Sequence, residues 1–179
     1  MSEGDACRER LARLGVRFES RPALREGSCG APEPLLVSAL SENVAIEPAA
    51  TMTCPVAEAL ARWTADVLTP ESDRHLKTQP AKLLIGTSYE CRNQRSGGKM
   101  SEHAFANGVD VMGFAFAARP NLAVTGQADG TPEGAFLDAA RKGACPYFTT
   151  VLGPGSDAAH ADHLHLDLRA RRANYRICQ

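Results

Sequence analysis

The clearest pattern in the chain is the strict alternation of polar residues and leucine from His163 to Leu168. A period of two is typical of a β-strand, so His163, His165 and Asp167 are predicted to share one face, with the leucines opposite. The leucine face requires a hydrophobic core. We therefore expect two imidazoles and a carboxylate, spaced about 7 Å apart along the strand, to face a polar region.

Apolar residues at helical spacing predict three helices. They are expected from Asp5 to Leu14, with Asp5 as the N-cap and Gly15 beyond the end; from Thr53-Cys54-Pro55 to Leu68; and from Thr131-Pro132-Glu133 onward. Thr69-Pro70 is predicted to close the second helix because proline lacks the amide donor of a helix interior. That helix carries Trp63 on its apolar face, which we interpret as a core residue.

Shorter apolar runs predict strands at residues 35–40, 43–46, 82–89, 111–117 and 145–152. Loops are predicted at residues 17–34, which contain several prolines and glycines, at the polar residues 70–81, and at a turn over 126–130. The polar, glycine-rich stretch at 93–98 lacks the G-x-x-x-x-G-K-[ST] pattern of a phosphate-binding loop, so we predict no nucleotide there.

Length and composition limit the fold class and the partners. The chain has 179 residues, of which 44% are hydrophobic and 23% charged, as is ordinary for one globular domain with a full core. The formal net charge of −1 gives no electrostatic case for nucleic acid as a partner. No window holds 18 consecutive apolar residues, so no membrane span is predicted.

The six cysteines bear on the compartment. They lie at positions 7, 29, 54, 91, 145 and 178, without a C-x-x-C pair, which argues against a zinc ribbon or a thioredoxin-type site. An even number fits three disulfides, with 15 possible connectivities; the alternative is buried free thiols in a cytosolic protein. Because disulfides persist outside the reducing cytosol, we expect an exported protein whose signal peptide is not part of this sequence.

Four of the five histidines fall in two polar clusters. His160, His163 and His165 lie within nine residues, whereas His103 precedes Asp110 by seven residues. A lone buried histidine is usually a hydrogen-bonded core residue, but two on one strand face favour a metal. Two imidazoles and a carboxylate are a common ligand set for catalytic zinc, with water in the fourth position. The remaining histidine, at position 75, is expected on the surface.

The end of the chain is basic from Arg169 to Arg176. Such a run is most often a solvated face, but beside a metal site it is also suited to steer an anionic polymer. Both interpretations stay open from the sequence.

Two motifs resemble a metallopeptidase superfamily that unites lysostaphin, the D-Ala-D-Ala peptidases and hedgehog. Its first signature is S-x-H-x-x-G-x-A-x-D, which Ser101, His103 and Asp110 match, while Ala106 and Gly108 exchange the two small residues. The H-x-x-H-x-H spacing that begins at residue 160 is similar to that of murein endopeptidases. The segments at 89–92, 101–104, 145–148, 151–155 and 160–168 resemble more closely the bacterial extensin-like C-terminal domain family, over nearly the whole chain.

The resemblance implies a role for each residue that matches. It implies Zn²⁺ held by His103, Asp110 and His165. The implied catalytic residues are His163 as general base, Asp162 as an alternative base, and His160 to stabilise the oxyanion or orient His163. Arg92 and Tyr89 would bind a substrate carboxylate, with Ser101 in the same substrate-binding group, and Asp167 would orient a ligand imidazole.

The expected fold is α+β, a central antiparallel sheet with flanking helices in one domain over residues 1–179. Residues 1–80 would form a helical N-terminal part and residues 81–179 the core that carries the metal site.

The function that the resemblance implies is a zinc-dependent peptidase in the periplasm of a Gram-negative bacterium. It would hydrolyse peptidoglycan stem peptides or crosslinks at D,D or L,D bonds. Endopeptidase activity is favoured over carboxypeptidase activity, and the protein is expected to be a monomer. The alternatives are a non-catalytic peptidoglycan-binding module that keeps the fold, and a disulfide-rich structural protein with an adventitious metal.

Overall fold

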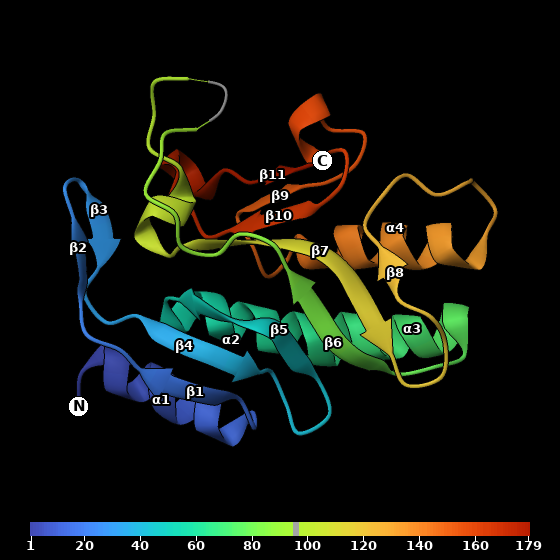
Figure 1. Ribbon diagram of the computed structural model, residues 1–179, viewed down its shortest axis with the longest axis horizontal. Helices are drawn as coiled ribbons and strands as arrows, with labels where there is room; N and C mark the ends of the chain where they lie inside the picture. The colour runs from blue at the N-terminus through green and yellow to red at the C-terminus, as the bar shows by residue number, and fades with distance from the viewer. Residues whose placement is uncertain (95–96) are drawn as a thin grey trace.

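A nine-stranded mixed sheet organises the molecule (Figure 1). The computed structural model describes residues 1–94 and 97–179. The main sheet has the order β1-β4-β5-β6-β7-β10-β9-β11, and β8 pairs with β7. Its strands are β1 (Arg17–Ser20), β4 (Leu35–Ala39), β5 (Ala45–Met52), β6 (Pro80–Ile85), β7 (Gly108–Phe116), β8 (Leu122–Ala123), β9 (Thr150–Leu152), β10 (Leu164–Asp167) and β11 (Ile177–Cys178). A separate hairpin pairs β2 (Leu24–Glu26) with β3 (Cys29–Ala31).

The α+β class is confirmed, but the prediction of an antiparallel sheet is wrong for two strand pairs. β5 pairs with β6 in parallel, and so does β9 with β11, while the other pairs are antiparallel. The helical crossover between β5 and β6 returns the chain in its original direction, as parallel neighbours require. Figure 1 shows the helices α2, α3 and α4 along one face of the sheet.

The first helix, α1 (Glu3–Arg13), begins earlier than predicted, and its N-cap is Ser2 rather than Asp5. The Ser2 hydroxyl accepts from the Asp5 amide at 3.0 Å, and the Asp5 carboxylate accepts from the Ser2 amide at 3.1 Å. This reciprocal capping box satisfies two amides that lack helical partners. Gly15, at φ +80°, follows the end of the helix as predicted.

The second helix does not stop at Thr69-Pro70, and that prediction is wrong. α2 (Cys54–Trp63) passes through a π turn at Thr64–Leu68 into α3 (Thr69–Leu76). Pro70 lies in the first turn of α3, where the π turn already changes the hydrogen-bond register, so its missing amide costs little. His75 therefore lies on a helix, with its Nε2 3.0 Å from a carboxylate oxygen of Glu71.

The loop predicted at residues 17–34 is also wrong, because β1, β2 and β3 lie there. β1 gains its pairing from β4, which no local pattern reveals. The strand predicted at 35–40 is confirmed as β4. The strands predicted at 43–46 and 111–117 correspond to β5 and β7, those at 82–89 and 145–152 are shorter, and the helix from Pro132 is α4 (Pro132–Ala144).

The core lies between the sheet and its helices. Trp63 is fully buried, its indole N–H donates to the Ala140 carbonyl at 3.0 Å, and its ring packs against Phe114 and Phe148. Leu164 and Leu166 of β10 are buried in the same core. Their burial confirms the predicted leucine face and leaves the opposite face of β10 to the histidines.

Three disulfides pair all six cysteines: Cys7 with Cys54, Cys29 with Cys91, and Cys145 with Cys178. The first ties α1 to α2, the second ties the β2–β3 hairpin to the segment after β6, and the third ties the end of α4 to β11. Three disulfides favour an extracytoplasmic location for the protein. In the described residues, no helix is long and apolar enough to cross a membrane.

Candidate metal centre

Strand register brings two distant polar clusters together. His165 on β10 pairs directly with Asp110 on β7. His103 lies on a short 3-10 helix, η2 (Glu102–Phe105), immediately before β7. The chain leaves this helix and enters β7 within three residues, so that Asp110 already lies on the strand. These three residues are hereafter called the floor triad. His103 and Asp110 are buried, and His165 is half-buried.

The two small residues at the signature's glycine and alanine positions, Ala106 and Gly108, have different structural roles. Ala106 ends η2 at φ +52°, a left-handed conformation in which an alanine is strained. Gly108 lies against β10, where an added Cβ would meet the Asp167 Cβ at 3.0 Å and the Leu166 carbonyl oxygen at 3.1 Å. The exchange of glycine and alanine relative to the signature therefore strains position 106 and opens space at position 108.

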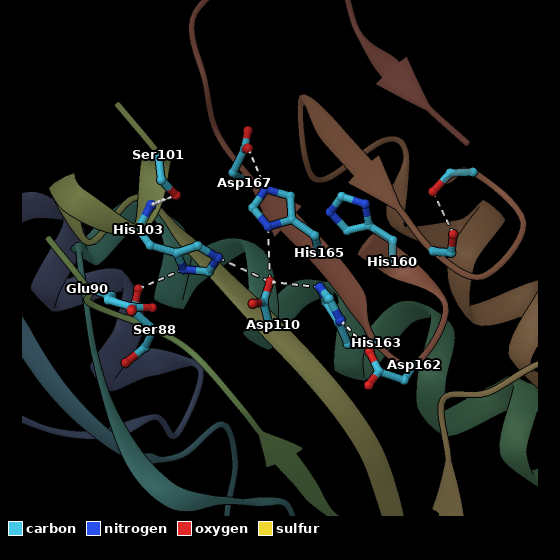
Figure 2. A network of polar contacts seen from close by, with 12 residues as sticks. Ser88, Glu90, Ser101, His103, Asp110, His160, Asp162, His163, His165 and Asp167 are labelled. Atoms are coloured by element: carbon cyan, nitrogen blue, oxygen red, sulfur yellow. Dashed lines mark hydrogen bonds and ion pairs between the residues drawn. The ribbon is translucent and has the colours of Figure 1, made fainter. Parts of the chain in front are cut away.

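The floor triad converges on one carboxylate oxygen (Figure 2). Asp110 Oδ1 lies 3.1 Å from His103 Nε2 and 3.0 Å from His165 Nδ1, and one ligand atom from each residue lies within 4.8 Å of the others. Zinc with ligands at 2.0–2.2 Å in a tetrahedron places neighbouring ligand atoms roughly 3.3 Å apart. The spacing fits a metal ion of this size.

Outer partners fix the orientation of both imidazoles. His103 Nδ1 lies 2.9 Å from the Ser88 carbonyl oxygen, which can only accept, so Nδ1 carries the proton. His165 Nε2 lies 2.7 Å from Asp167 Oδ2, which confirms the predicted contact. A carbonyl or carboxylate behind a ligand imidazole is the usual arrangement at metal sites, and it leaves the other nitrogen for the ion.

Hydrogen bonds at the floor of the cleft favour the ionised forms of Asp110, His165 and Asp167. Burial raises the pKa of Asp110, but hydrogen bonds with His103 and His165 outweigh it and hold that pKa well below its usual range. Burial lowers the pKa of His165, whereas its hydrogen bonds with Asp110 and Asp167 prevail and raise it to about 9. Asp167 is buried too, and its contact with His165 lowers its pKa. Both carboxylates are thus ionised at neutral pH and suited to hold a cation.

Two further histidines, hereafter the rim histidines, stand beside the floor triad. His163 directs Nε2 towards Asp110 Oδ1 at 3.8 Å, while its Nδ1 lies 2.9 Å from Asp162 Oδ1. His160 has its Nδ1 2.6 Å from Asp157 Oδ1, and its ring centre lies 5.1 Å from that of His163. Each rim histidine is thus held by a carboxylate on its own loop, as Figure 2 shows for His163.

A cleft of about 710 Å³ opens over this cluster. Of the predicted substrate-binding residues, Arg92 lines the cleft and pairs with Glu90 at 3.0 Å. Ser101 also lines it, but its hydroxyl accepts from the His103 amide at 3.2 Å as the cap of η2. Tyr89 is not among the described residues that line the cleft, and its hydroxyl lies 3.0 Å from a Glu26 carboxylate oxygen. The structure thus gives Tyr89 a tethering contact instead of a place in the cleft.

Some site residues escaped the sequence analysis. The Ser88 carbonyl is a backbone group and leaves no sequence signal. Asp157 did leave one, because an aspartate three residues before His160 is a typical N-cap, and its carboxylate accepts from the His160 amide at 3.0 Å. In the glycine-rich stretch at 93–98, for which no nucleotide site was predicted, Asn93 forms an isolated antiparallel β-bridge with Met100. Residues 95 and 96 lie outside the described residues.

Comparison with known proteins places the chain in a family. The family model described as Extensin-like protein C-terminus matches residues 5–179. No curated protein and no solved structure matches the chain. The chain belongs to the extensin-like C-terminal domain family.

Proposed function

We propose that this member of the extensin-like family is a zinc-dependent peptidase that hydrolyses peptidoglycan stem peptides or crosslinks, as an endopeptidase in preference. One observation carries the proposal: the floor triad fits a metal ion, and the His163 imidazole, held by the Asp162 carboxylate, lies beside it. A site that only binds metal needs no such imidazole, whereas hydrolysis needs a base.

The donor set favours zinc. Two imidazole nitrogens and one carboxylate oxygen match the three protein ligands of catalytic zinc sites, which leave one position open. His103, Asp110 and His165 would hold the ion, and the cleft gives access to the open position. When bound, zinc activates water and polarises a carbonyl group.

His163 is the general base in this proposal. Its Nδ1 faces the Asp162 carboxylate, which favours the tautomer with a free Nε2 lone pair directed at the floor. Nε2 accepts the proton of the attacking water and passes it to the leaving amine. Asp162, the alternative base from the sequence, then serves to orient His163 and stabilise its charged form, as the acidic member of a triad does.

His160 has a supporting role. Its ring lies 5.1 Å from His163 and 5.8 Å from His165, and Asp157 holds its Nδ1. Because Nδ1 faces a carboxylate and carries a proton, Nε2 is an acceptor in the neutral ring and donates only when the ring is an imidazolium. We propose that His160, as an imidazolium paired with Asp157, donates from Nε2 to the oxyanion that develops at the scissile carbonyl.

The compartment agrees with a wall substrate. Three disulfides favour an extracytoplasmic protein, and peptidoglycan is an extracytoplasmic polymer whose stem peptides carry free carboxylates. Arg92, at the cleft wall, offers a planar guanidinium that suits a carboxylate. We propose the periplasm as the location and peptidoglycan as the partner.

The test is digestion of purified murein sacculi by zinc-loaded protein, with products identified by mass spectrometry. Wild type and His75→Ala, a histidine on α3, should release the same new muropeptides, while His163→Ala should release almost none. If neither wild type nor His75→Ala releases products although both pellet with sacculi, the chain is a non-catalytic wall-binding module.

A further inference from the structure

The cleft has two chemically different ends. His160 and His163 precede β10, whereas Arg169, Arg171 and Arg172 follow it, and all five residues line the cleft. Figure 1 shows the segment after β10 next to η2 on one side, and the segment at residue 160 on the other. An ion pair at 4.0 Å between Arg169 and Glu102 of η2 confirms the first proximity. The strand thus separates a histidine end from an arginine end.

The arginine end gathers positive charge from two segments. Arg92 and Lys99 reach it from the stretch before η2, because the Ser101 amide donates to the Arg92 carbonyl and Glu102 contacts Arg169. Two carboxylates offset part of this charge. Glu90 pairs with Arg92 at 3.0 Å, and Glu102 forms a long ion pair with Arg169 at 4.0 Å. Asp167 also lines the cleft, but its carboxylate is engaged by His165 and by the Arg169 amide, and within the described residues Lys99, Arg171 and Arg172 form no ion pair.

Arg171 is the best-placed cation of this end. Its guanidinium donates to the Thr149 carbonyl at 3.0 Å and to the Thr150 hydroxyl at 2.7 Å, at the start of β9. Among the described residues, neither Arg171 nor Arg172 has a carboxylate partner. Most other described arginines pair with acids, as Arg10 does with Glu58 and Arg119 with Glu133, although Arg17, Arg25 and Arg176, which do not line the cleft, form no ion pair either. A fixed, half-buried guanidinium without a counter-ion is suited to bind an anion.

We propose that Arg171 and Arg172 form an anion subsite that binds a substrate carboxylate in addition to the one assigned to Arg92. The proposal rests on the proposed function, since it supposes a peptide in the cleft. It assigns the substrate class: a peptide with at least two free carboxylates on the side of the cleaved bond that lies beyond the C-terminal end of β10. The histidine end then receives the other, less acidic side.

Binding of paired peptides tests this subsite separately from cleavage. The probes are two fluorescent stem peptides that differ only in one internal group, a free carboxylate or its carboxamide. Affinities are measured by anisotropy on the zinc-loaded His163→Ala variant of this 179-residue chain, which is not expected to cleave the peptides. We expect the carboxylate peptide to bind roughly 10-fold tighter or more, as charge-assisted hydrogen bonds predict.

The arginine variants assign the preference to residues. Arg172→Gln removes an exposed guanidinium that makes no hydrogen bond or ion pair with the described residues, so the variant should fold and weaken the preference. Arg171→Gln should weaken it further, Arg171→Lys should retain part of it, and Arg74→Gln on α3 should leave it intact. Equal affinity for both peptides, or a preference that survives in the Arg171→Gln/Arg172→Gln double variant, would overturn the subsite. If His163→Ala shows the preference but zinc-loaded wild type cleaves neither the peptides nor sacculi, the subsite stands and the peptidase is refuted.

Discussion

The floor and the rim of the cleft are built on different principles. The floor triad lies on β7, β10 and the helix η2, with each imidazole held by a backbone carbonyl or a buried carboxylate. The rim histidines lie in the connection before β10, His160 at the end of a 3-10 helix (Ala158–His160) and His163 after it, and Asp162, which holds His163, is exposed. Strand register sets Asp110 directly opposite His165, whereas the rim histidines have no strand partner. We infer that the floor holds the ion and the rim performs the proton transfer.

The largest expected effect is at the centre of the floor. Asp110→Asn keeps the shape of the side chain but removes its charge and replaces one of the two carboxylate oxygens by an NH2 group. The variant should lose stoichiometric zinc and all cleavage, because two neutral imidazoles alone hold zinc poorly. Metal content and sacculi digestion, with Asp73→Asn on α3 as control, measure this. Full zinc content in Asp110→Asn would remove Asp110 from the site.

The rim should separate catalysis from metal binding. His163→Ala should lower the cleavage rate by roughly 100-fold to 10,000-fold, which is the usual contribution of general acid–base catalysis. Asp162→Asn should cost less, because His163 remains. The readout is the initial rate on a crosslinked peptide at equal zinc content. A normal rate for His163→Ala with a severe loss for Asp162→Asn would make Asp162 the base.

The support of the floor should have an intermediate effect. Asp167→Asn leaves the three ligands in place but weakens the hold on His165 Nε2. Loss of such an outer partner typically costs roughly 10-fold to 100-fold in metal affinity. Competition with a chromophoric chelator measures the affinity, and Asp157→Asn, which supports a rim histidine instead, should leave it unchanged. Equal losses in both variants would erase the distinction between floor and rim.

The floor should also govern the pH dependence of the metal-free protein. The folded-state pKa of His165 is raised from 6.5 to about 9, so its contribution to stability is complete below pH 6.5 and is lost as the pH rises towards 9. The lowered pKa values of Asp110 and Asp167 act in the opposite direction: their contribution is present above about pH 4 and is lost at lower pH. Chemical denaturation of chelator-treated protein should show both declines, and His165→Ala should abolish the alkaline one. An unchanged alkaline decline in that variant would contradict the assignment.

The smallest expected effect concerns the segment between His103 and Asp110, which contains Ala106 and Gly108. Ala106→Gly should stabilise the protein by less than about 1 kcal/mol, because relief of the left-handed strain at φ +52° is partly offset by the loss of a buried methyl group. The matched change Gly108→Ala should destabilise it and weaken zinc affinity, since the new Cβ meets β10 beside His165. Thermal unfolding of both variants measures the difference. The same sign of change in both would refute the separate tasks given to these positions.

The sequence predicted the local features of this fold better than its long-range ones. Alternation identified β10 and its histidine face, and helical spacing identified α1, α2 and α4. The continuation through Pro70 into α3 escaped, because a π turn accommodates proline where an α-helix would end. The strand β1 and the parallel β5–β6 pair escaped as well, since their partners are distant in sequence.

For the site, residue type and spacing sufficed to bring His103, Asp110 and His165 together as candidates. They did not reveal the outer contacts, because the Ser88 carbonyl is backbone and the places of Tyr89 and Arg171 depend on the folded chain. Disulfide connectivity was likewise open in sequence, where six cysteines allow 15 pairings.

The most direct test of the account is the zinc content of three proteins under native mass spectrometry: wild type, His163→Ala and His103→Ala. The division between floor and rim predicts one zinc ion in wild type, one in His163→Ala and none in His103→Ala, with cleavage in wild type alone. Loss of zinc from His163→Ala, or its retention in His103→Ala, would contradict the assignment of the ligands and with it the proposed mechanism.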